Sequence, residues 1–189
     1  MSSLRVISGV ARGKRLRSVP GDTTRPITDL VKESLFNIIG RDIEEASFWD
    51  LFAGTGSVGI EALSRGARFI RFVDIDHLAI KTIHRNLDST GLESHSEVIK
   101  MDSFSMLATK PDRDFDYIYL APPQYKDFWK RALMALDQNI GWINKDGWVI
   151  VQIHPVEYEN LSESGELNHL IEFDQRKYGS TLLVFYRRP

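Results

Sequence analysis

Residues 50–59 read Asp-Leu-Phe-Ala-Gly-Thr-Gly-Ser-Val-Gly, and this stretch decides the fold. Its glycines at positions 54, 56 and 59 have the G-x-G-x-x-G spacing of loops that bind nucleotides between a strand and a helix. Apolar residues at 47–53 predict the strand, and those at 58–64 predict the helix. Glycine lets a ligand approach the backbone closely, and the start of a helix offers N–H groups to an anion. The stretch therefore predicts a ligand-binding turn, although a tight turn without a ligand has the same spacing.

The segments that follow alternate between the periodicities of strands and helices. Further strands are expected at 69–74, 95–101, 116–121 and 148–154, with helices at 77–87 and 128–136. This alternation predicts an α/β fold with a mostly parallel sheet and helices on both of its faces. The last two apolar stretches, 170–173 and 181–186, are too close together for a crossover helix. We therefore expect them to pair as an antiparallel hairpin at one edge of the sheet.

The beginning of the chain differs from the rest in charge. Residues 1–41 carry eight Lys or Arg and three acidic residues, a net charge of +5, whereas the remainder carries −7. Alternating apolar residues at 4–19 predict a β-hairpin, and Thr28 is a suitable N-cap for a helix at 29–39. We expect a domain boundary after residue 41. The basic segment indicates a polyanionic partner, and a solvated charged surface is the alternative.

The composition excludes several classes of protein. The chain has 189 residues, of which 42% are hydrophobic and 26% charged, as is typical of a soluble globular domain. Because it has no cysteine, disulfides, thiolate metal sites and a cysteine nucleophile are excluded, and its five histidines lack metal-ligand spacing. It begins without a secretory signal and has no apolar run near the ~20 residues that cross a bilayer. We therefore expect a cytoplasmic protein without a metal site and without a membrane partner.

Three acidic residues at predicted strand ends narrow the choice of ligand. Asp74 ends a strand 18 residues after Gly56, where a ribose-binding carboxylate is expected. Asp50 places an anion before the glycines, which suits the ammonium of a methionine moiety and would repel a pyrophosphate. Asp102 follows the third strand, where it could accept a hydrogen bond from the amine of adenine. These positions favour S-adenosylmethionine. A nicotinamide-linked oxidoreductase is the alternative, because the glycine spacing alone does not separate the two ligands.

A second motif, Ala121-Pro-Pro-Gln-Tyr125, follows the strand expected at 116–121. The two prolines stop the strand and hold the chain in an extended turn. Their carbonyls stay available to accept hydrogen bonds from a substrate, with Gln124 and Tyr125 projecting over the ligand. A rigid connection to the following helix is the alternative, and the local sequence does not decide between the two.

Taken together, these motifs resemble a known family, the bacterial methyltransferases that modify the exocyclic N2 of a guanine in 16S ribosomal RNA. The resemblance covers nearly the whole chain. Its most specific part is the glycine loop combined with residues 24–37, which read Thr-Arg-Pro-Ile-Thr-Asp-Leu-Val-Lys-Glu-Ser-Leu-Phe-Asn. The other matching stretches are 5–9, 13–16, 61–67, 115–125 and 178–186.

The resemblance implies a Rossmann-like methyltransferase fold with a seven-stranded, mostly parallel sheet. Residues 42–189 would form the methyltransferase domain, and residues 1–41 an RNA-binding extension made of the hairpin and the first helix. S-adenosylmethionine would be the methyl donor, and 16S ribosomal RNA or an assembling small ribosomal subunit the partner. We expect the protein to act as a monomer.

The site residues are expected in three groups. The residues expected at the cofactor are Asp50, Phe52, Gly54, Thr55, Gly56, Gly59, Asp74, Ile75, Asp102 and Ser103. The residues expected at the target base are Pro122, Pro123, Gln124 and Tyr125. The residues expected at RNA phosphates are Arg5, Arg12, Lys14, Arg15, Arg17, Arg25 and Lys32.

The chain departs from the family at Ala121, where relatives carry Asp or Asn before the two prolines and an aromatic residue directly after them. A guanine amine is a weak nucleophile, and in the family that side chain and the first proline carbonyl accept its protons. Here we expect the Pro122 carbonyl to accept one N–H and Gln124 the other, while Tyr125 stacks on the flipped base. The alternative is an RNA-binding protein whose catalysis is weakened or lost.

Overall fold

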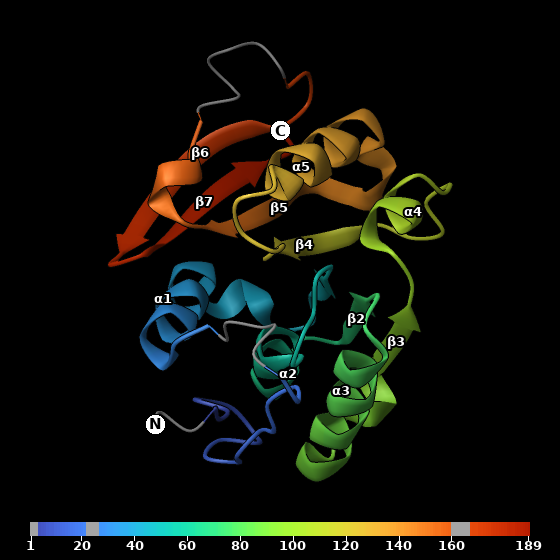
Figure 1. Cartoon of the computed structure of the whole chain (residues 1–189), viewed down its shortest axis with the longest axis vertical. Coiled ribbons are helices and arrows are strands. Elements are labelled where there is room, and N and C mark those ends of the chain that lie inside the picture. The colour runs from blue at the N-terminus through green and yellow to red at the C-terminus, as the bar shows by residue number, and fades with distance from the viewer. Residues whose placement is uncertain (1–3, 22–26, 160–166) are drawn as a thin grey trace. The chain divides into compact units, whose positions relative to one another are not determined.

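The computed structural model describes residues 4–21, 27–159 and 167–189 (Figure 1). The chain divides into two compact units, Met1–Asp102 and Ser103–Pro189. This division falls well after the boundary at residue 41 that the sequence suggested, because the described part of the basic segment packs within the first unit. Among the described residues, no helix has both the length and the apolar character needed to span a bilayer.

The first unit contains a parallel sheet and the helices that flank it. The strands are β1 (Ser47–Asp50), β2 (Phe69–Asp74) and β3 (Ser96–Lys100), in the order β3-β2-β1. The helices are α1 (Asp29–Ile39), α2 (Ser57–Ser64) and α3 (His77–Thr90), with short 3₁₀ turns η1 (Gly40–Ile43) and η2 (Glu93–His95). Thr28 caps α1 as predicted, and its side chain accepts a hydrogen bond from the N–H of Val31.

The second unit contains the antiparallel edge of the sheet. Its strands are β4 (Phe115–Leu120), β5 (Ile143–Ile153), β6 (Ile171–Tyr178) and β7 (Thr181–Arg187), in the order β4-β5-β7-β6. β4 and β5 are parallel, whereas β7 is antiparallel to both of its neighbours. The helices are α4 (Ser103–Leu107) and α5 (Phe128–Gln138), with 3₁₀ turns η3 (Ile140–Trp142) and η4 (Pro155–Glu157). The predicted edge hairpin is therefore confirmed.

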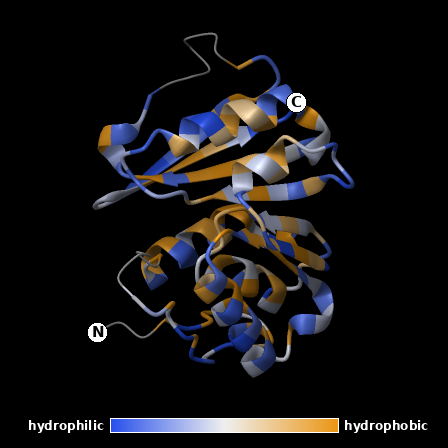
Figure 2. Cartoon of the chain, turned by 45° about the vertical axis from the view of Figure 1, so that its right-hand side comes forward, coloured by the Kyte–Doolittle hydropathy of each residue, from blue (hydrophilic) through white to orange (hydrophobic). Residues whose placement is uncertain are grey.

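The seven strands follow the order β3-β2-β1-β4-β5-β7-β6, which is the predicted α/β architecture. Apolar residues, orange in Figure 2, occur in the inner strands and in the helices α1 and α2, whereas the edge strand β6 is mostly polar and has no buried residue. α2 is buried along its whole length, in keeping with its composition of small and apolar residues. α1 buries one face only, since Leu35, Phe36 and Ile39 lie in the core while Leu30 is exposed.

The N-terminal segment is not the regular hairpin that its alternation predicted. In the described part of the segment, Arg5 and Arg15 form an antiparallel bridge, the N–H groups of Val6 and Leu16 donate across it to the carbonyls of Lys14 and Leu4, and the chain between the paired residues turns. The reason is that several backbone N–H groups of this segment bond to side chains of α2 and α3 instead of to a second strand. The segment 4–20, which we call the arm, is consequently part of the first unit.

Candidate functional site

The glycine loop joins β1 to α2 with the backbone that its sequence requires. Gly54 and Gly56 have φ values of 53° and 74°, in the left-handed region that favours glycine. Gly59 has a different role, since a Cβ atom there would lie 2.3 Å from Cε1 of Phe72. The first two glycines therefore shape the turn, and the third allows α2 to pack closely on β2.

Asp74 is tied to this loop from the end of β2. Its Oδ2 accepts a hydrogen bond from the Gly54 N–H at 2.8 Å, and its Oδ1 accepts one from the Asp76 N–H at 2.9 Å. The carboxylate remains partly accessible, and the next residue, Ile75, is 64% exposed. An accessible carboxylate beside an exposed apolar side chain fits a ribose diol with an adenine ring next to it.

The environment of the Asp50 carboxyl differs from the one that the sequence suggested. The side chain is buried, and its Oδ2 accepts a hydrogen bond from the Gly59 N–H at 3.2 Å. Burial raises the pKa of this carboxyl from 3.8 to about 8, and the nearby Asp74 contributes in the same direction. The expected anion is thus mostly a neutral acid at pH 7. A bound ammonium group would favour its ionisation.

This pKa gives a testable pH dependence of stability. Because the folded state holds the Asp50 proton more tightly than the unfolded state, the free energy of unfolding should fall as the pH rises from about 4 to 8. Asp50→Asn keeps an oxygen for the Gly59 N–H but cannot titrate. Between pH 5 and pH 8, urea denaturation should show the wild type losing at least about 1 kcal/mol relative to this variant. Parallel pH profiles of the two proteins would contradict the assignment.

The remaining predicted cofactor residues lie around the same loop or follow β3. The Met101 N–H donates to the carbonyl of Asp74 at 3.1 Å, which brings the segment after β3 to the end of β2. Asp102 is half-buried directly after this contact. In the loop, Thr55 is buried and accepts a hydrogen bond from the Ser57 N–H, whereas Phe52 is half-buried. Ser103 is buried at the start of α4, in the second unit.

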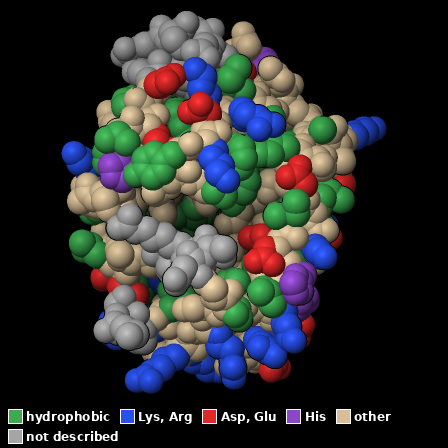
Figure 3. All heavy atoms as spheres, viewed as in Figure 1, with side chains coloured by type: hydrophobic (Ala, Val, Ile, Leu, Met, Phe, Trp, Pro, Cys, Tyr) green, Lys and Arg blue, Asp and Glu red, His purple; other side chains and the backbone are tan. Residues whose placement is uncertain are grey.

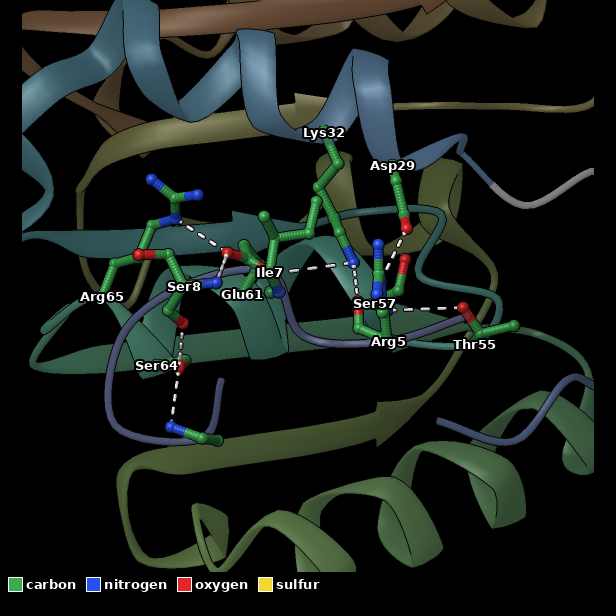
Figure 4. Close-up of polar contacts among 12 residues, drawn as sticks. Arg5, Ile7, Ser8, Asp29, Lys32, Thr55, Ser57, Glu61, Ser64 and Arg65 are labelled. Atoms are coloured by element: carbon green, nitrogen blue, oxygen red, sulfur yellow. Dashed lines mark hydrogen bonds and ion pairs between the residues drawn. The ribbon is translucent and has the colours of Figure 1, made fainter. Parts of the chain in front are cut away.

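The arm is anchored to α2 by a buried carboxylate (Figure 4). Both oxygens of Glu61 accept hydrogen bonds from the arm, from the N–H of Ile7 at 2.7 Å and of Ser8 at 2.9 Å. The same carboxylate pairs with Arg65 at 2.8 Å and with the Lys32 ammonium at 3.7 Å. Ser64 adds a further anchor, because its hydroxyl donates to the carbonyl of Ser8 and accepts from the arm.

This arrangement corrects the role predicted for Lys32. Its side chain is fully buried, and its ammonium also donates to the carbonyl of Arg5 at 2.6 Å. Burial lowers the pKa of Lys32, while the carboxylates of Glu61 and Asp29 oppose that shift. A buried and paired ammonium does not reach a phosphate, so Lys32 holds the arm and α1 in place instead of contacting RNA.

A second buried side chain connects the arm to the glycine loop. Asn86 of α3 accepts a hydrogen bond from the Arg17 N–H at 2.8 Å and donates to the Arg17 carbonyl at 3.1 Å. Its amide also donates to the carbonyl of Thr55 at 2.9 Å. Neither Glu61 nor Asn86 was among the residues predicted for the site, although Asn86 shares the buried face of α3 with Ile83.

The other predicted RNA contacts are mostly exposed, but not all are equally available. Arg12, Arg15 and Arg17 are exposed on the arm. Lys14 is exposed too, yet its ammonium donates to the carbonyls of Ser89 and Thr90 at the end of α3. Figure 3 shows Lys and Arg side chains gathered over the lower part of the first unit. Arg5 is paired with Asp29 at 2.9 Å. Arg25 lies outside the described residues.

In the second unit, the two prolines follow β4 as predicted. Pro122 is buried and Pro123 is exposed, while Gln124 is half-buried. Tyr125 is 66% exposed and has a φ of 61°, an uncommon conformation for a side chain of this size. The turn therefore presents a polar and an aromatic side chain from a rigid backbone. Within the described residues, no cluster of His, Cys, Asp or Glu could hold a metal ion.

The strand order, the glycine loop and the carboxylate at the end of β2 define a class of protein, the S-adenosylmethionine-dependent methyltransferases. The comparisons agree with this class. A solved structure described as "Putative methyltransferase yhhF from Escherichia coli" matches with a TM-score of 0.82 and 26% sequence identity, over 99% of this chain and 98% of that one.

The chain belongs to the family described as "Conserved hypothetical protein 95", whose model matches residues 4–187. "Putative rRNA methyltransferase YlbH" of Bacillus subtilis is 39% identical over 187 residues, which cover 98% of this chain and 99% of that protein. "Ribosomal RNA small subunit methyltransferase D" of Haemophilus influenzae is 32% identical over 151 residues, 79% of this chain and 78% of that protein. These relatives confirm the predicted methyltransferase family and exclude the oxidoreductase alternative.

Proposed function

We propose that this protein transfers a methyl group from S-adenosylmethionine to the exocyclic N2 of a guanine in 16S ribosomal RNA. The observation that carries the proposal is the glycine loop held by Asp74, in a chain whose relatives are named ribosomal RNA methyltransferases. The exposed basic side chains of the arm support an RNA substrate.

The first unit has the groups that S-adenosylmethionine requires. Asp74 would accept hydrogen bonds from the ribose hydroxyls, and the exposed Ile75 would cover one face of the adenine. Asp102 would accept a hydrogen bond from the adenine amine. Asp50, which lies under the loop, would ionise beside the ammonium of the methionine moiety. When bound, S-adenosylmethionine supplies a methyl group on a sulfonium, which is already a reactive electrophile.

The second unit supplies the groups for the guanine. The Pro122 carbonyl would accept one N–H of the exocyclic amine and the Gln124 side chain the other, which directs the nitrogen lone pair at the methyl group. Tyr125 would stack on the base. Ala121 offers no acceptor, so catalysis here depends on orientation more than on a side-chain carboxylate or amide at that position.

A single-turnover assay tests the proposal. Labelled S-adenosylmethionine is mixed with excess enzyme and undermethylated 16S RNA, either free or in small ribosomal subunits. We expect label in the RNA, and digestion to nucleosides should give N2-methylguanosine. Cofactor binding without transfer to either substrate would support the RNA-binding protein without catalysis instead. A methylated nucleoside other than N2-methylguanosine would refute the assignment of the guanine N2.

Gln124→Ala should lower the single-turnover rate by roughly 3–10-fold, the cost of one hydrogen bond to the amine. The dissociation constant for S-adenosylmethionine should stay unchanged, since Gln124 serves the substrate only. Gln175→Ala, an exposed glutamine on β6, is the matched control and should change neither quantity. An unchanged rate in the Gln124 variant would remove this side chain from the mechanism.

Replacing Arg12, Arg15 and Arg17 together by Gln should weaken RNA binding and flatten its salt dependence. Each lost phosphate contact reduces the slope of log K against log salt by about 0.7, so three contacts reduce it by about 2. Filter binding at several salt concentrations measures the slope. The control replaces Lys110, Arg113 and Lys145, three exposed basic residues of the second unit. Equal slopes for both triple variants would mean that the arm makes no specific phosphate contacts.

A further inference from the structure

The backbone at Tyr125 is held in a strained conformation by a distant side chain. A non-glycine residue with φ near 61° costs energy and persists only where its surroundings impose it. Here the Tyr125 N–H donates to Oε2 of Glu157 at 2.7 Å. Glu157 lies 32 residues later, in η4. This hydrogen bond is therefore a contact that holds the backbone at Tyr125 in its left-handed conformation.

The second oxygen of Glu157 holds the backbone of His154. Oε1 accepts a hydrogen bond from the N–H of His154 at 3.2 Å, as part of the capping box that opens η4. The His154 ring is oriented in turn, because its Nδ1 accepts the N–H of Val156 at 3.3 Å. One carboxylate thus holds two segments of the second unit in a fixed relation.

The two rings that result lie next to each other. The centroids of Tyr125 and His154 are 5.8 Å apart, and their planes are inclined by 42°. Val156, which follows His154 closely in sequence, is 74% exposed. Tyr125 is exposed and His154 is half-buried, and accessible aromatic rings are the kind of surface on which unstacked RNA bases are bound.

We propose that Tyr125 and His154 together form a stacking surface for an unpaired nucleobase of the substrate, and that Glu157 is its positioning residue. This inference rests on the proposed RNA methyltransferase function. Glu157 does not touch the RNA. Its carboxylate is engaged by two backbone N–H groups, so it acts through the geometry of the two rings.

Two variants that remove the same charge separate this role from a general electrostatic effect. Glu157→Gln leaves only one carbonyl oxygen, which faces one of the two N–H groups while the amide NH₂ opposes the other. Glu159→Gln removes a carboxylate from the same segment, one that is 61% exposed and pairs with Lys130 at 2.9 Å. Loss of a negative charge alone should leave RNA binding unchanged or strengthen it.

We expect Glu157→Gln to raise the KM for RNA by about 3–10-fold. The reason is that one of the two hydrogen bonds that position the rings is lost. The kcat should remain within about twofold, since stacking serves the bound and the reacting base alike. The affinity for S-adenosylmethionine and the melting temperature should equal those of Glu159→Gln. His154→Ala should raise KM as well, and the double variant should show less than the product of the two single effects.

The outcomes are distinguishable. If the wild type neither binds nor methylates 16S RNA, the proposed function fails. If the wild type is active and Glu157→Gln behaves like Glu159→Gln, only the inference fails. It also fails if Glu157→Gln lowers the melting temperature and the cofactor affinity to the same extent as the RNA affinity, because that would show a merely structural role.

Discussion

Glu61→Ala should lower the free energy of unfolding by about 3–5 kcal/mol, the typical cost of removing one partner of a buried ion pair. The Lys32 ammonium is fully buried beside this carboxylate, and the N–H groups of Ile7 and Ser8 donate to it. These three donors and the Arg65 guanidinium would lose this acceptor, and among the described contacts only the Lys32 ammonium would keep another one, the carbonyl of Arg5. Urea denaturation of the two proteins measures the difference.

The control for this prediction is Glu93→Ala, which removes an exposed carboxylate and should change stability by less than about 0.5 kcal/mol. If Glu61→Ala does not fold, the double variant Glu61→Gln, Lys32→Met provides the test. It removes the buried charge pair together and should be more stable than Glu61→Gln alone. A loss below about 1 kcal/mol in Glu61→Ala would show that the arm is held by other contacts.

Asp74→Ala should weaken the binding of S-adenosylmethionine by roughly 1–3 kcal/mol, because a partly buried acceptor for the ribose hydroxyls is lost. The loop would also lose the hydrogen bond that its Gly54 N–H donates to this carboxylate. Isothermal titration calorimetry measures the affinity. Asp76→Ala is the matched control, since its side chain caps α3 through the Leu78 N–H and has no predicted contact with the cofactor.

The two aspartate variants should therefore lose different properties, one of them stability and the other cofactor affinity. Asp76→Ala should lose roughly 1 kcal/mol of stability, as helix N-caps do, and keep its cofactor affinity. Asp74→Ala should lose affinity at a temperature where both proteins are folded. Equal affinities for the two variants would remove Asp74 from the cofactor site.

Much of the fold could be predicted because its elements have strong local signals. β2 spans the predicted residues, and α1 starts and ends where its caps are. Some boundaries are wrong: β1 ends at Asp50 and not at residue 53, and β5 and β6 include polar residues that were not predicted as strand. β6 extends to Tyr178, although residues 174–177 are polar, because an edge strand can expose both its faces. β5 begins at Ile143, before a polar stretch that shifts its register against β4.

The sequence could predict where some residues of the candidate site lie in the fold, but not which groups they contact. Glycine spacing and strand ends placed Asp50 and Asp74 near the loop, because chain connectivity determines that placement. The protonation of Asp50 depends on burial by residues distant in sequence, which no local pattern contains. Lys32 did carry a signal, since it shares the helix face of Leu35 and Phe36, which is the buried face of α1. The position of Lys32 on this helix face indicates burial, whereas its charge alone suggested exposure to RNA.

The amide of Asn86 bonds at once to the backbone of Arg17 and to the carbonyl of Thr55. Deleting the first twenty residues would thus do more than remove positive charge. It would remove the contacts that Asn86 and Glu61 make with the arm, and Asn86 is the residue that joins the arm to the glycine loop. Failure of a shortened protein to methylate RNA would therefore not by itself show a defect in RNA recognition. The affinity of that protein for S-adenosylmethionine would have to be measured as well.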